Sequence, residues 1–267
     1  MKHIFPIIVF FILANNCNCQ TFSIKGYTRN VQGAPIPYAS IGIENNNVGC
    51  ISDKEGYFQL HIPDSLKNTQ LTFTHLSYKK CLKEIHELIT GKDNLIILED
   101  SIIDIPEIQI IPQKGKWLKN KGIRIPKGSI QIDSLGEEVG ILFNMKEALL
   151  EEIQIPILKC THDSVKIRIN MYQIDDKLNA TPIFILPIHK TITKNTNKAI
   201  TTIYPENITY IPTGKIGITI EMIEIYGTGE LLFPLYSAHS LYKKIVLNRF
   251  EKIPFCMGLK IYSRNIE

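Results

Sequence analysis

The feature that most constrains the fold is a series of short segments in which apolar and polar residues alternate, separated by turn-forming residues. Each segment is about one strand long, and this period of two is typical of β-strands rather than helices. In the first half the segments are FSIKGYT, YASIGIE, YFQLHIP, TQLTFTH and NLIILE, and in the second half VKIRINMYQI and KIGITIEMIEIY are the clearest. The pattern predicts an all-β protein made of antiparallel β-sandwiches.

One segment of the first half departs from this alternation. In CLKEIHELIT, residues 81–90, four side chains could share one face of a short amphipathic helix: Cys81, Ile85, Leu88 and Ile89. A strand followed by a loop fits the same residues, so both alternatives stay open.

The N-terminus has the composition of a secretory signal. A short positive region precedes residues 4–14 (IFPIIVFFILA), an apolar run too short for a stable membrane anchor. The small residues that follow predict cleavage before Gln20, with residues 1–19 as the signal peptide. Lipidation at Cys17 or Cys19 is the alternative, although the residues before them lack the Leu-x-small pattern of a lipobox. We therefore expect an exported protein of the periplasm, the outer membrane or the cell surface.

Four cysteines remain after the signal, and they divide evenly between the two halves. Cys50 with Cys81 and Cys160 with Cys256 are possible disulfides in an oxidising compartment, but the sequence does not fix connectivity. Four buried free thiols are the alternative interpretation. No cysteine has CxxC or Cys/His spacing, which argues against a zinc site.

Composition argues against a disordered chain, and charge argues against a nucleic-acid-binding protein. The 267 residues are 44% hydrophobic, enough for two cores, and the formal charge of +4 is too small for a nucleic-acid footprint. Residues 112–135 are rich in Gly, Pro, Lys and Arg, and no acidic residue occurs from position 108 to 132. This segment is predicted to be a basic linker or an extended crossing segment. Its charge around Trp117 could meet an anionic envelope surface, although a solvated basic loop is the favoured interpretation.

A resemblance rests on the order of residues from 24 to 78. A glycine closes the first strand, a Gly-x-Pro-x-x-x-Ala-like segment follows, then a Gly-x-x-Ser-Asp-x-x-Gly-x-Phe turn and a strand ending in Tyr. The matching positions are Gly26, Gly33, Pro35 or Pro37, Ala39, Gly49, Ser52, Asp53, Gly56, Phe58 and Tyr78. This region resembles the carboxypeptidase-regulatory-like domain common in exported proteins of the Bacteroidetes cell envelope. Ser77 departs from the pattern, since the family usually has Gly before the Tyr, so the turn there is expected to differ.

The resemblance implies a transthyretin-like sandwich of about seven strands over residues 20–111. In zinc carboxypeptidases this domain is an appendage, and it also precedes outer-membrane TonB-dependent transporters. Residues 136–267 look like the β-rich region that follows the domain in short envelope proteins, and are expected to form a second antiparallel sandwich. No activity comes with either resemblance.

The sequence lacks the motifs that the main hydrolytic and phosphate-binding chemistries need. No His is followed by Glu three residues later, as a zinc carboxypeptidase requires, and no Gly-x-Ser-x-Gly or Gly-rich phosphate loop occurs. The pair Glu137 and Glu138 is interpreted as a solvated turn. We therefore expect no catalytic, cofactor-binding or metal-binding residues, and no enzymatic activity.

A turn and a set of aromatic residues have other predicted roles. In SDKEGYF, Asp53 is predicted to cap a hairpin turn, Gly56 to take a positive φ, and Phe58 to restart the strand toward the core, so the stretch is a fold signature rather than a metal site. Exposed aromatic side chains can serve as flat platforms for glycans, although packing is the commoner role of tyrosines at strand spacing. The platform candidates are Trp117, Tyr204, Tyr226 and Tyr236.

These observations together predict a non-enzymatic, exported cell-envelope protein that acts as an interaction or accessory module. Its partner is expected to be an envelope protein or a glycan rather than nucleic acid, with possible peripheral association with the outer membrane. The alternatives are a glycan-binding component of a surface uptake system and a hydrolase with an unrecognised site.

Overall fold

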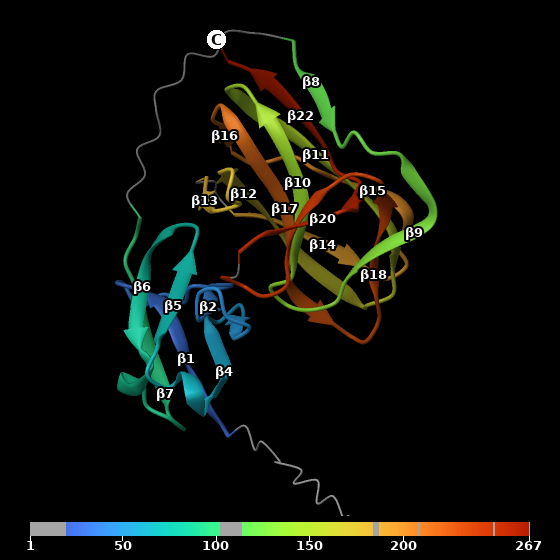
Figure 1. The fold of residues 1–267 in the computed structure, drawn as a ribbon. Coiled ribbons are helices and arrows are strands. Elements are labelled where there is room, and N and C mark those ends of the chain that lie inside the picture. The colour runs from blue at the N-terminus through green and yellow to red at the C-terminus, as the bar shows by residue number, and fades with distance from the viewer. Residues whose placement is uncertain (1–19, 102–113, 184–186, 208, 248, 267) are drawn as a thin grey trace, which may run out of the picture.

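The computed structural model describes residues 20–101, 114–183, 187–207, 209–247 and 249–266, and in these residues it consists of two β-sandwiches (Figure 1). The first sandwich, drawn in blue to cyan, precedes the second, drawn in green to red. No helix in the described part of the chain is long and apolar enough to span a membrane. The predicted signal peptide, residues 1–19, lies outside the described residues.

The first sandwich has seven strands in two sheets, as predicted. One sheet has the order β4-β1-β7 and the other the order β3-β2-β5-β6. The elements are β1 (Thr21–Asn30), β2 (Ser40–Gly42), β3 (Gly49–Ile51), β4 (Tyr57–Pro63), η1 (Asp64–Leu66), β5 (Gln70–His75), β6 (Tyr78–Glu84), η2 (Ile85–Glu87) and β7 (Asp93–Leu98), where η marks a 3₁₀ turn.

Alternation explains which side chains fill the first core. In β4 the side chains of Phe58, Leu60 and Ile62 are buried, and those between them face solvent. The ring of Phe58 packs edge-on against that of Phe73 from the facing sheet, 5.5 Å between centroids. The predicted entry of Phe58 into the core is therefore confirmed.

The second sandwich also consists of two sheets, which enclose a core of buried Ile, Leu, Val, Met and Phe side chains. The seven-stranded sheet has the order β13-β12-β17-β10-β19-β20 with β14 on β12, and the eight-stranded sheet the order β21-β18-β11-β22-β8 with β15 and β16 on β11 and β9 on β18. The strands are β8 (Lys116–Lys119), β9 (Arg124–Ile132), β10 (Glu138–Met145), β11 (Ala148–Cys160), β12 (Ser164–Ile174), β13 (Ala180–Pro182), β14 (Ile188–Thr193), β15 (Asn197–Ile203), β16 (Thr209–Ile211), β17 (Gly214–Tyr226), β18 (Leu231–Tyr236), β19 (Ser240–Lys243), β20 (Glu251–Ile253), β21 (Cys256–Met257) and β22 (Lys260–Asn265).

The interpretation of residues 112–135 as a basic linker is wrong over most of its length. Residues 116–119 form β8, which pairs with β22, and residues 124–132 form β9, which pairs with β18. Lysines and a proline are suited to strands at a sheet edge, because they discourage pairing with another chain while the side chains remain solvated. In β9 the charged and turn-forming residues interrupt the alternation of apolar and polar residues that identifies the other strands.

The possible helix over residues 81–90 is also wrong, and the alternative of a strand followed by a loop is correct. The segment begins in β6, continues through the single turn η2, and ends in a loop. Within η2 only Ile85 is buried. Cys81 and Leu88 also pack against the core, but they do so from a strand and a loop rather than from one face of a helix.

The four described cysteines are free thiols, so neither possible disulfide is present. The register places Cys50 opposite Ile41, Ile41 opposite Phe73, and Phe73 opposite Cys81. Three ladder steps of about 4.8 Å separate Cys50 from Cys81, far beyond the reach of a disulfide. Cys160 and Cys256 lie on β11 and β21 with β18 between them, which excludes the second pair for the same reason.

The two sandwiches contact each other through the outer face of the seven-stranded sheet. A small apolar cluster joins them, formed by Tyr38 and Ile51 from the first sandwich and Ile223 and Val246 from the second. The backbone N–H of Asn45 also donates to the carbonyl of Leu247, at 3.2 Å. One face of the second sandwich is therefore covered by the first.

Candidate functional site

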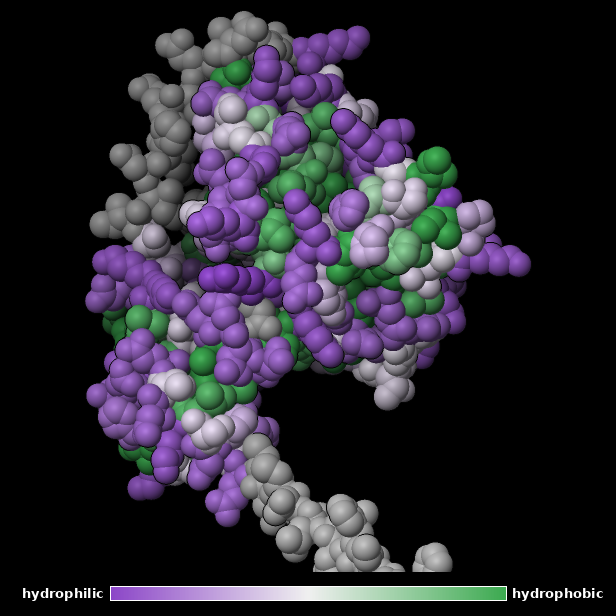
Figure 2. Space-filling view, in the orientation of Figure 1, coloured by the Kyte–Doolittle hydropathy of each residue, from purple (hydrophilic) through white to green (hydrophobic). Residues whose placement is uncertain are grey.

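A cleft of about 700 Å³ lies where the two sandwiches meet. The first sandwich contributes residues from β2, β5 and β6 to its walls, and the second contributes residues from β12, β17 and β19. In the space-filling view the surface near this junction is mostly hydrophilic (Figure 2). The cleft is lined by polar and apolar groups in similar measure, from strands and from the loops between them.

Four charged residues form one row across the outer face of the seven-stranded sheet. Arg168 on β12 is opposite Glu221 on β17, Glu221 is opposite Glu138 on β10, and Glu138 is opposite Lys243 on β19. Residues directly opposite one another share a face, so alternation alone brings these side chains together. All four are at least 91% buried.

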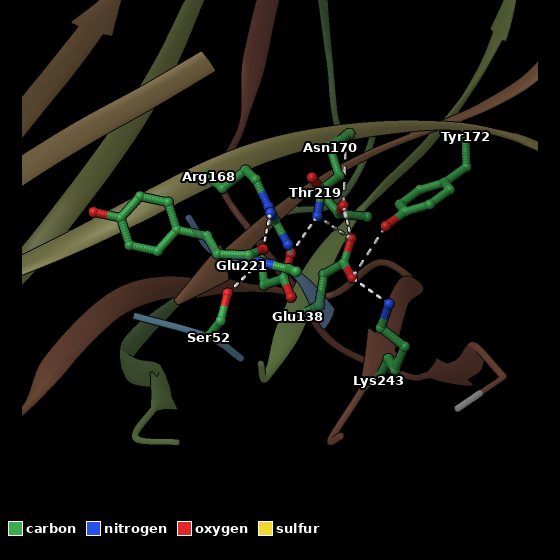
Figure 3. A network of polar contacts seen from close by, with 10 residues as sticks. Ser52, Glu138, Arg168, Asn170, Tyr172, Thr219, Glu221 and Lys243 are labelled. Carbon is green, nitrogen blue, oxygen red and sulfur yellow. Dashed lines mark hydrogen bonds and ion pairs between the residues drawn. The ribbon is translucent and has the colours of Figure 1, made fainter. Parts of the chain in front are cut away.

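The row forms two ion pairs bridged by an amide (Figure 3). Arg168 donates to Oε2 of Glu221 through Nε at 3.1 Å and Nη2 at 2.8 Å, and Nζ of Lys243 lies 2.5 Å from Oε2 of Glu138. The amide nitrogen of Asn170 donates to both carboxylates, at 2.6 Å to Glu221 and 3.1 Å to Glu138. The hydroxyl of Thr219 also donates to Glu138.

The surroundings favour the charged forms of Glu138 and Arg168. Burial alone would raise the pKa of Glu138, but the charge of Lys243 and the hydrogen bonds from Lys243, Thr219 and Asn170 outweigh burial and hold that pKa below its ordinary value. Burial would lower the pKa of Arg168, but the Glu221 carboxylate raises it. The four charges sum to zero, and each cation neutralises its own acid.

This arrangement does not provide a free acid or base. A general acid needs a carboxyl that is protonated near neutral pH, and a nucleophile needs an adjacent base. Glu138 is held as a carboxylate, and the pKa of the neighbouring Tyr172 is raised well above its ordinary value, by burial and then by the charge of Glu138. The paired row therefore suits docking better than proton transfer.

The interpretation of Glu137 and Glu138 as a solvated turn is wrong. Glu138 begins β10 and is fully buried, and Glu137 is 6% exposed. Oε2 of Glu137 accepts from the backbone N–H of Asp133 at 3.0 Å, and Oε1 accepts from the hydroxyl of Tyr242 at 2.9 Å. The reason for the error is that strands of the second sandwich far apart in the sequence bring Tyr242 to Glu137 and Lys243 to Glu138.

The signature turn is as predicted, and it has a structural role. Oδ1 of Asp53 accepts from the backbone N–H groups of Glu55, at 2.9 Å, and Tyr57, at 2.8 Å, and Gly56 has φ of +78°. Asp53 uses its carboxylate on the turn itself. Among the described residues, no group of three or more His, Cys, Asp or Glu is placed to hold a metal ion.

Two of the four platform candidates lie in one row on the outer face of the eight-stranded sheet. Trp117 on β8 is opposite Tyr262 on β22, Tyr262 is opposite Glu152 on β11, and Tyr204 follows β15 at the position opposite Glu152 by register. Trp117 is 45% exposed and Tyr204 is 67% exposed. The sequence analysis missed Tyr262, whose position beside Trp117 depends on the pairing of two strands far apart in the chain.

The other two candidates lie elsewhere. Tyr226 ends β17 in the seven-stranded sheet, and is opposite Ser164. Tyr236 is half-buried at the end of β18, where its ring lies against Gly258. The structure therefore does not assemble the four candidates into a single platform.

Comparison with known proteins identifies the first sandwich. The family model described as CarboxypepD_reg-like domain matches residues 24–110. No curated protein matches the chain. Two solved structures of infectious bursal disease virus are similar to it. The structure of the Gx strain has 11% identity and a TM-score of 0.27, over 91% of this chain and 70% of that chain. The structure of the Gt strain has 10% identity and a TM-score of 0.20, over 91% of this chain and 63% of that chain. The first sandwich is therefore a carboxypeptidase-regulatory-like domain.

Proposed function

We propose that this protein is a non-enzymatic, exported protein of the cell envelope that acts as an interaction module, with its two sandwiches held together as one unit. The observation that carries the proposal is the charged row of Arg168, Glu221, Glu138 and Lys243. Each of its ionisable groups is paired within the row. This cluster of buried charges therefore supports assembly of the two sandwiches rather than a reaction.

The contacts of Tyr38 support the idea that the two sandwiches act as a unit. Nη1 of Arg168 donates to the backbone carbonyl of Tyr38 at 2.8 Å, and the Tyr38 hydroxyl donates to Oε1 of Glu224 at 2.7 Å. The row therefore also binds the first sandwich. A partner that contacts both sandwiches would meet a fixed surface rather than two independent domains.

A hydrolase is the weaker alternative. It would require ionisable groups that converge in a deep cleft, and such groups do converge in the cleft between the sandwiches. However, the carboxylates of Glu138 and Glu221 are neutralised by Lys243 and Arg168, which leaves neither as a general acid.

Export is inferred from the N-terminal sequence, in which a positive region precedes the apolar residues 4–14 and small residues follow. The test is to purify the tagged protein from its native cells after fractionation and to sequence its N-terminus. We expect recovery from the envelope or periplasmic fraction, a mature chain that begins at Gln20, and an envelope component that co-purifies. An uncleaved chain in the cytoplasm would overturn the proposal.

A control variant makes the co-purification specific. Tyr38→Ala removes the hydroxyl and the ring that join the two sandwiches, whereas Tyr57→Phe removes only the hydroxyl of a half-buried residue at the start of β4. We expect Tyr38→Ala to lose a partner that binds both sandwiches and Tyr57→Phe to keep it.

Glycan recognition is the second candidate function. The observation that favours it is the aromatic row on the eight-stranded sheet, where the rings of Trp117 and Tyr262 lie 5.3 Å apart. Exposed rings on a rigid sheet suit stacking against the apolar faces of sugars. Binding of an oligosaccharide that is lost when Trp117 is changed to Ala would support it.

A further inference from the structure

The outer face of the eight-stranded sheet presents two parallel rows of side chains with different chemistry. The first row runs from Trp117 through Tyr262 and Glu152 to Tyr204. Between the rows the side chains point inward, as shown by the buried Ile153. The second outward row consists of Lys119, Lys260, Gln154 and Thr202. Each row spans three ladder steps of about 4.8 Å, which suits a chain of sugars better than a single one.

The aromatic end of the first row is held in place by Gly115, just before β8, and by Trp117 on β8. The ring of Tyr262 lies so close to Gly115 that a Cβ on Gly115 would be 2.4 Å from the ring. The ring of Trp117 is tilted 53° to that of Tyr262, with 5.3 Å between the ring centroids. Only glycine at position 115 leaves room for this ring, so the aromatic pair is pre-organised at the edge of the sheet.

Two lysines face each other at the same end of the second row. Lys119 is directly opposite Lys260, both are exposed, and neither takes part in the ion pairs found among the described residues. Like charges directly opposite one another destabilise a sheet. An anionic group bound between the two ammonium groups would remove this repulsion.

The other end of the two rows is not positively charged. Nε2 of Gln154 donates to Oε1 of Glu152 at 2.8 Å, and Tyr204 lies beyond this pair. Planar amide and carboxylate groups next to an exposed ring can hydrogen-bond to hydroxyl groups. The surface thus combines an anion-binding end with a hydroxyl-binding end.

We propose that this face binds an acidic oligosaccharide or polysaccharide chain that lies across the strands. Sugar rings stack on Trp117 and Tyr262, and a carboxylate of the chain binds between Lys119 and Lys260. The inference deepens the second candidate function, because it names the class of glycan and the residues that select it, and it rests on a binding role for the protein.

The same surface fits two other anionic partners less well. Nucleic-acid binding usually needs a larger excess of basic residues than the formal charge of +4 of the whole chain. Attachment to an anionic membrane would be favoured by a broad basic patch with apolar side chains that insert into it, whereas Glu152 and Gln154 interrupt this face. Membrane attachment is an outcome of the test below.

The chain contains a single tryptophan, Trp117, so its fluorescence reports on this site alone. The probes are oligogalacturonate, a neutral malto-oligosaccharide of the same length, and phosphatidylglycerol vesicles. We expect oligogalacturonate to change the emission of Trp117 with an affinity that weakens as salt rises, and the neutral sugar to bind at least about tenfold more weakly, since a charged hydrogen bond contributes about 1.5–3 kcal/mol.

Three variants test the assignment of residues. Lys119→Gln and Lys260→Gln should each weaken oligogalacturonate about tenfold and reduce the salt dependence. Gly115→Val should displace the Tyr262 ring and weaken all sugars. The matched control is Lys194→Gln, which removes an exposed lysine paired with Asp163 on the seven-stranded sheet side, and should leave binding unchanged. Far-UV circular dichroism checks that each variant is folded.

The outcomes separate this inference from the proposed function. Equal binding of neutral and acidic sugars, or binding of vesicles without binding of oligogalacturonate, would overturn the inference. If no sugar binds but the native protein still co-purifies with an envelope partner that Lys119→Gln retains, the inference fails and the proposed function stands. Cytoplasmic recovery would count against the proposed function whatever the sugar data show.

Discussion

The hydroxyl of Tyr38, in the first sandwich, donates a 2.7 Å hydrogen bond to Oε1 of Glu224 in the second sandwich and accepts one from Nζ of Lys166, also at 2.7 Å. Tyr38 is 4% exposed and has φ of +58°, a conformation that is costly for a residue with a bulky side chain. The contacts with the second sandwich compensate for this strain. Tyr38 is therefore the main polar connection between the two domains.

Removing the Tyr38 hydroxyl should weaken this connection without disturbing the packing of the ring. We expect Tyr38→Phe to destabilise the second sandwich by about 1–3 kcal/mol, because two hydrogen bonds are lost. Urea unfolding followed by the fluorescence of Trp117, which lies in the second sandwich, measures the effect. Tyr57→Phe, which loses only a 3.4 Å contact to Gln59, is the control and should leave the midpoint unchanged.

The buried pair of Arg168 and Glu221 should be far more sensitive than an exposed pair. Arg168→Met leaves the Glu221 carboxylate buried without a cation, and we expect a loss of about 3–5 kcal/mol. Lys159→Gln breaks the exposed pair with Glu230 and should cost at most about 1 kcal/mol. The double variant Arg168→Met with Glu221→Leu should recover part of the loss, since no uncompensated charge remains. Equal losses for Arg168→Met and Lys159→Gln would contradict the burial of the pair of Arg168 and Glu221.

Two histidines near Arg168 should make the protein less stable in mild acid. Burial, and then the positive charge of Arg168, lower the pKa of His75 and of His189 to about 4. The ordinary value is about 6.5, so the unfolded chain binds more protons than the folded chain between these values. Stability is therefore highest above about pH 6.5 and falls as pH decreases toward 4.

The measurement is urea unfolding at pH 7.5 and pH 5.0, a range in which carboxylates with ordinary pKa values titrate little. We expect a lower midpoint at pH 5.0 for the native sequence. His75→Gln combined with His189→Gln should reduce this difference, whereas replacing the exposed His61 by Gln should not. A midpoint that does not change with pH would show that the two rings are not desolvated in the folded state.

Local chemistry made much of the fold predictable from the sequence. Asp53, Gly56 and Phe58 act within seven residues of one another, so their roles follow from turn geometry and strand alternation. The alternation in β12 and β17 also identifies which side chains face the core. These features depend on neighbours in the sequence, which a single sequence displays.

The candidate sites depend on pairing between distant strands, which the sequence does not display. Glu138 resembles a surface residue in the sequence because nothing nearby indicates that Asn170 and Lys243 will be brought to it from distant strands. Tyr262 reads as an ordinary strand tyrosine, and it becomes notable only when β22 pairs with β8 and brings it beside Trp117. The polar face of a sheet looks the same in sequence whether water or another domain covers it.

The described cysteines should remain free thiols even under oxidising conditions. Burial raises the pKa of Cys50 to about 12, because its effect outweighs that of a backbone hydrogen bond from Gln59, which lowers the pKa. The reactive thiolate is therefore suppressed. Iodoacetamide should therefore label Cys50 slowly in the folded protein and rapidly in denaturant. Mass spectrometry of the denatured, unreduced protein should find all four described cysteines labelled. A peptide that links Cys160 to Cys256 would contradict the register of β11, β18 and β21.

Gly56 and Gly33 offer a matched pair that separates steric crowding from backbone strain. Both have positive φ, +78° and +82°, so alanine at either position carries the cost of the left-handed conformation, about 1 kcal/mol. A Cβ at Gly56 would lie 2.5 Å from the carbonyl oxygen of Thr28, whereas a Cβ at Gly33 meets nothing within 4 Å. We expect Gly56→Ala to destabilise the first sandwich clearly more than Gly33→Ala, and Glu55→Ala to have almost no effect. Circular dichroism during thermal unfolding measures the stability of all three variants.

Two outcomes would contradict this interpretation. Equal losses of stability for Gly56→Ala and Gly33→Ala would mean that the turn relaxes away from Thr28. A loss of bound metal or ligand in Glu55→Ala would contradict the structural role of the turn.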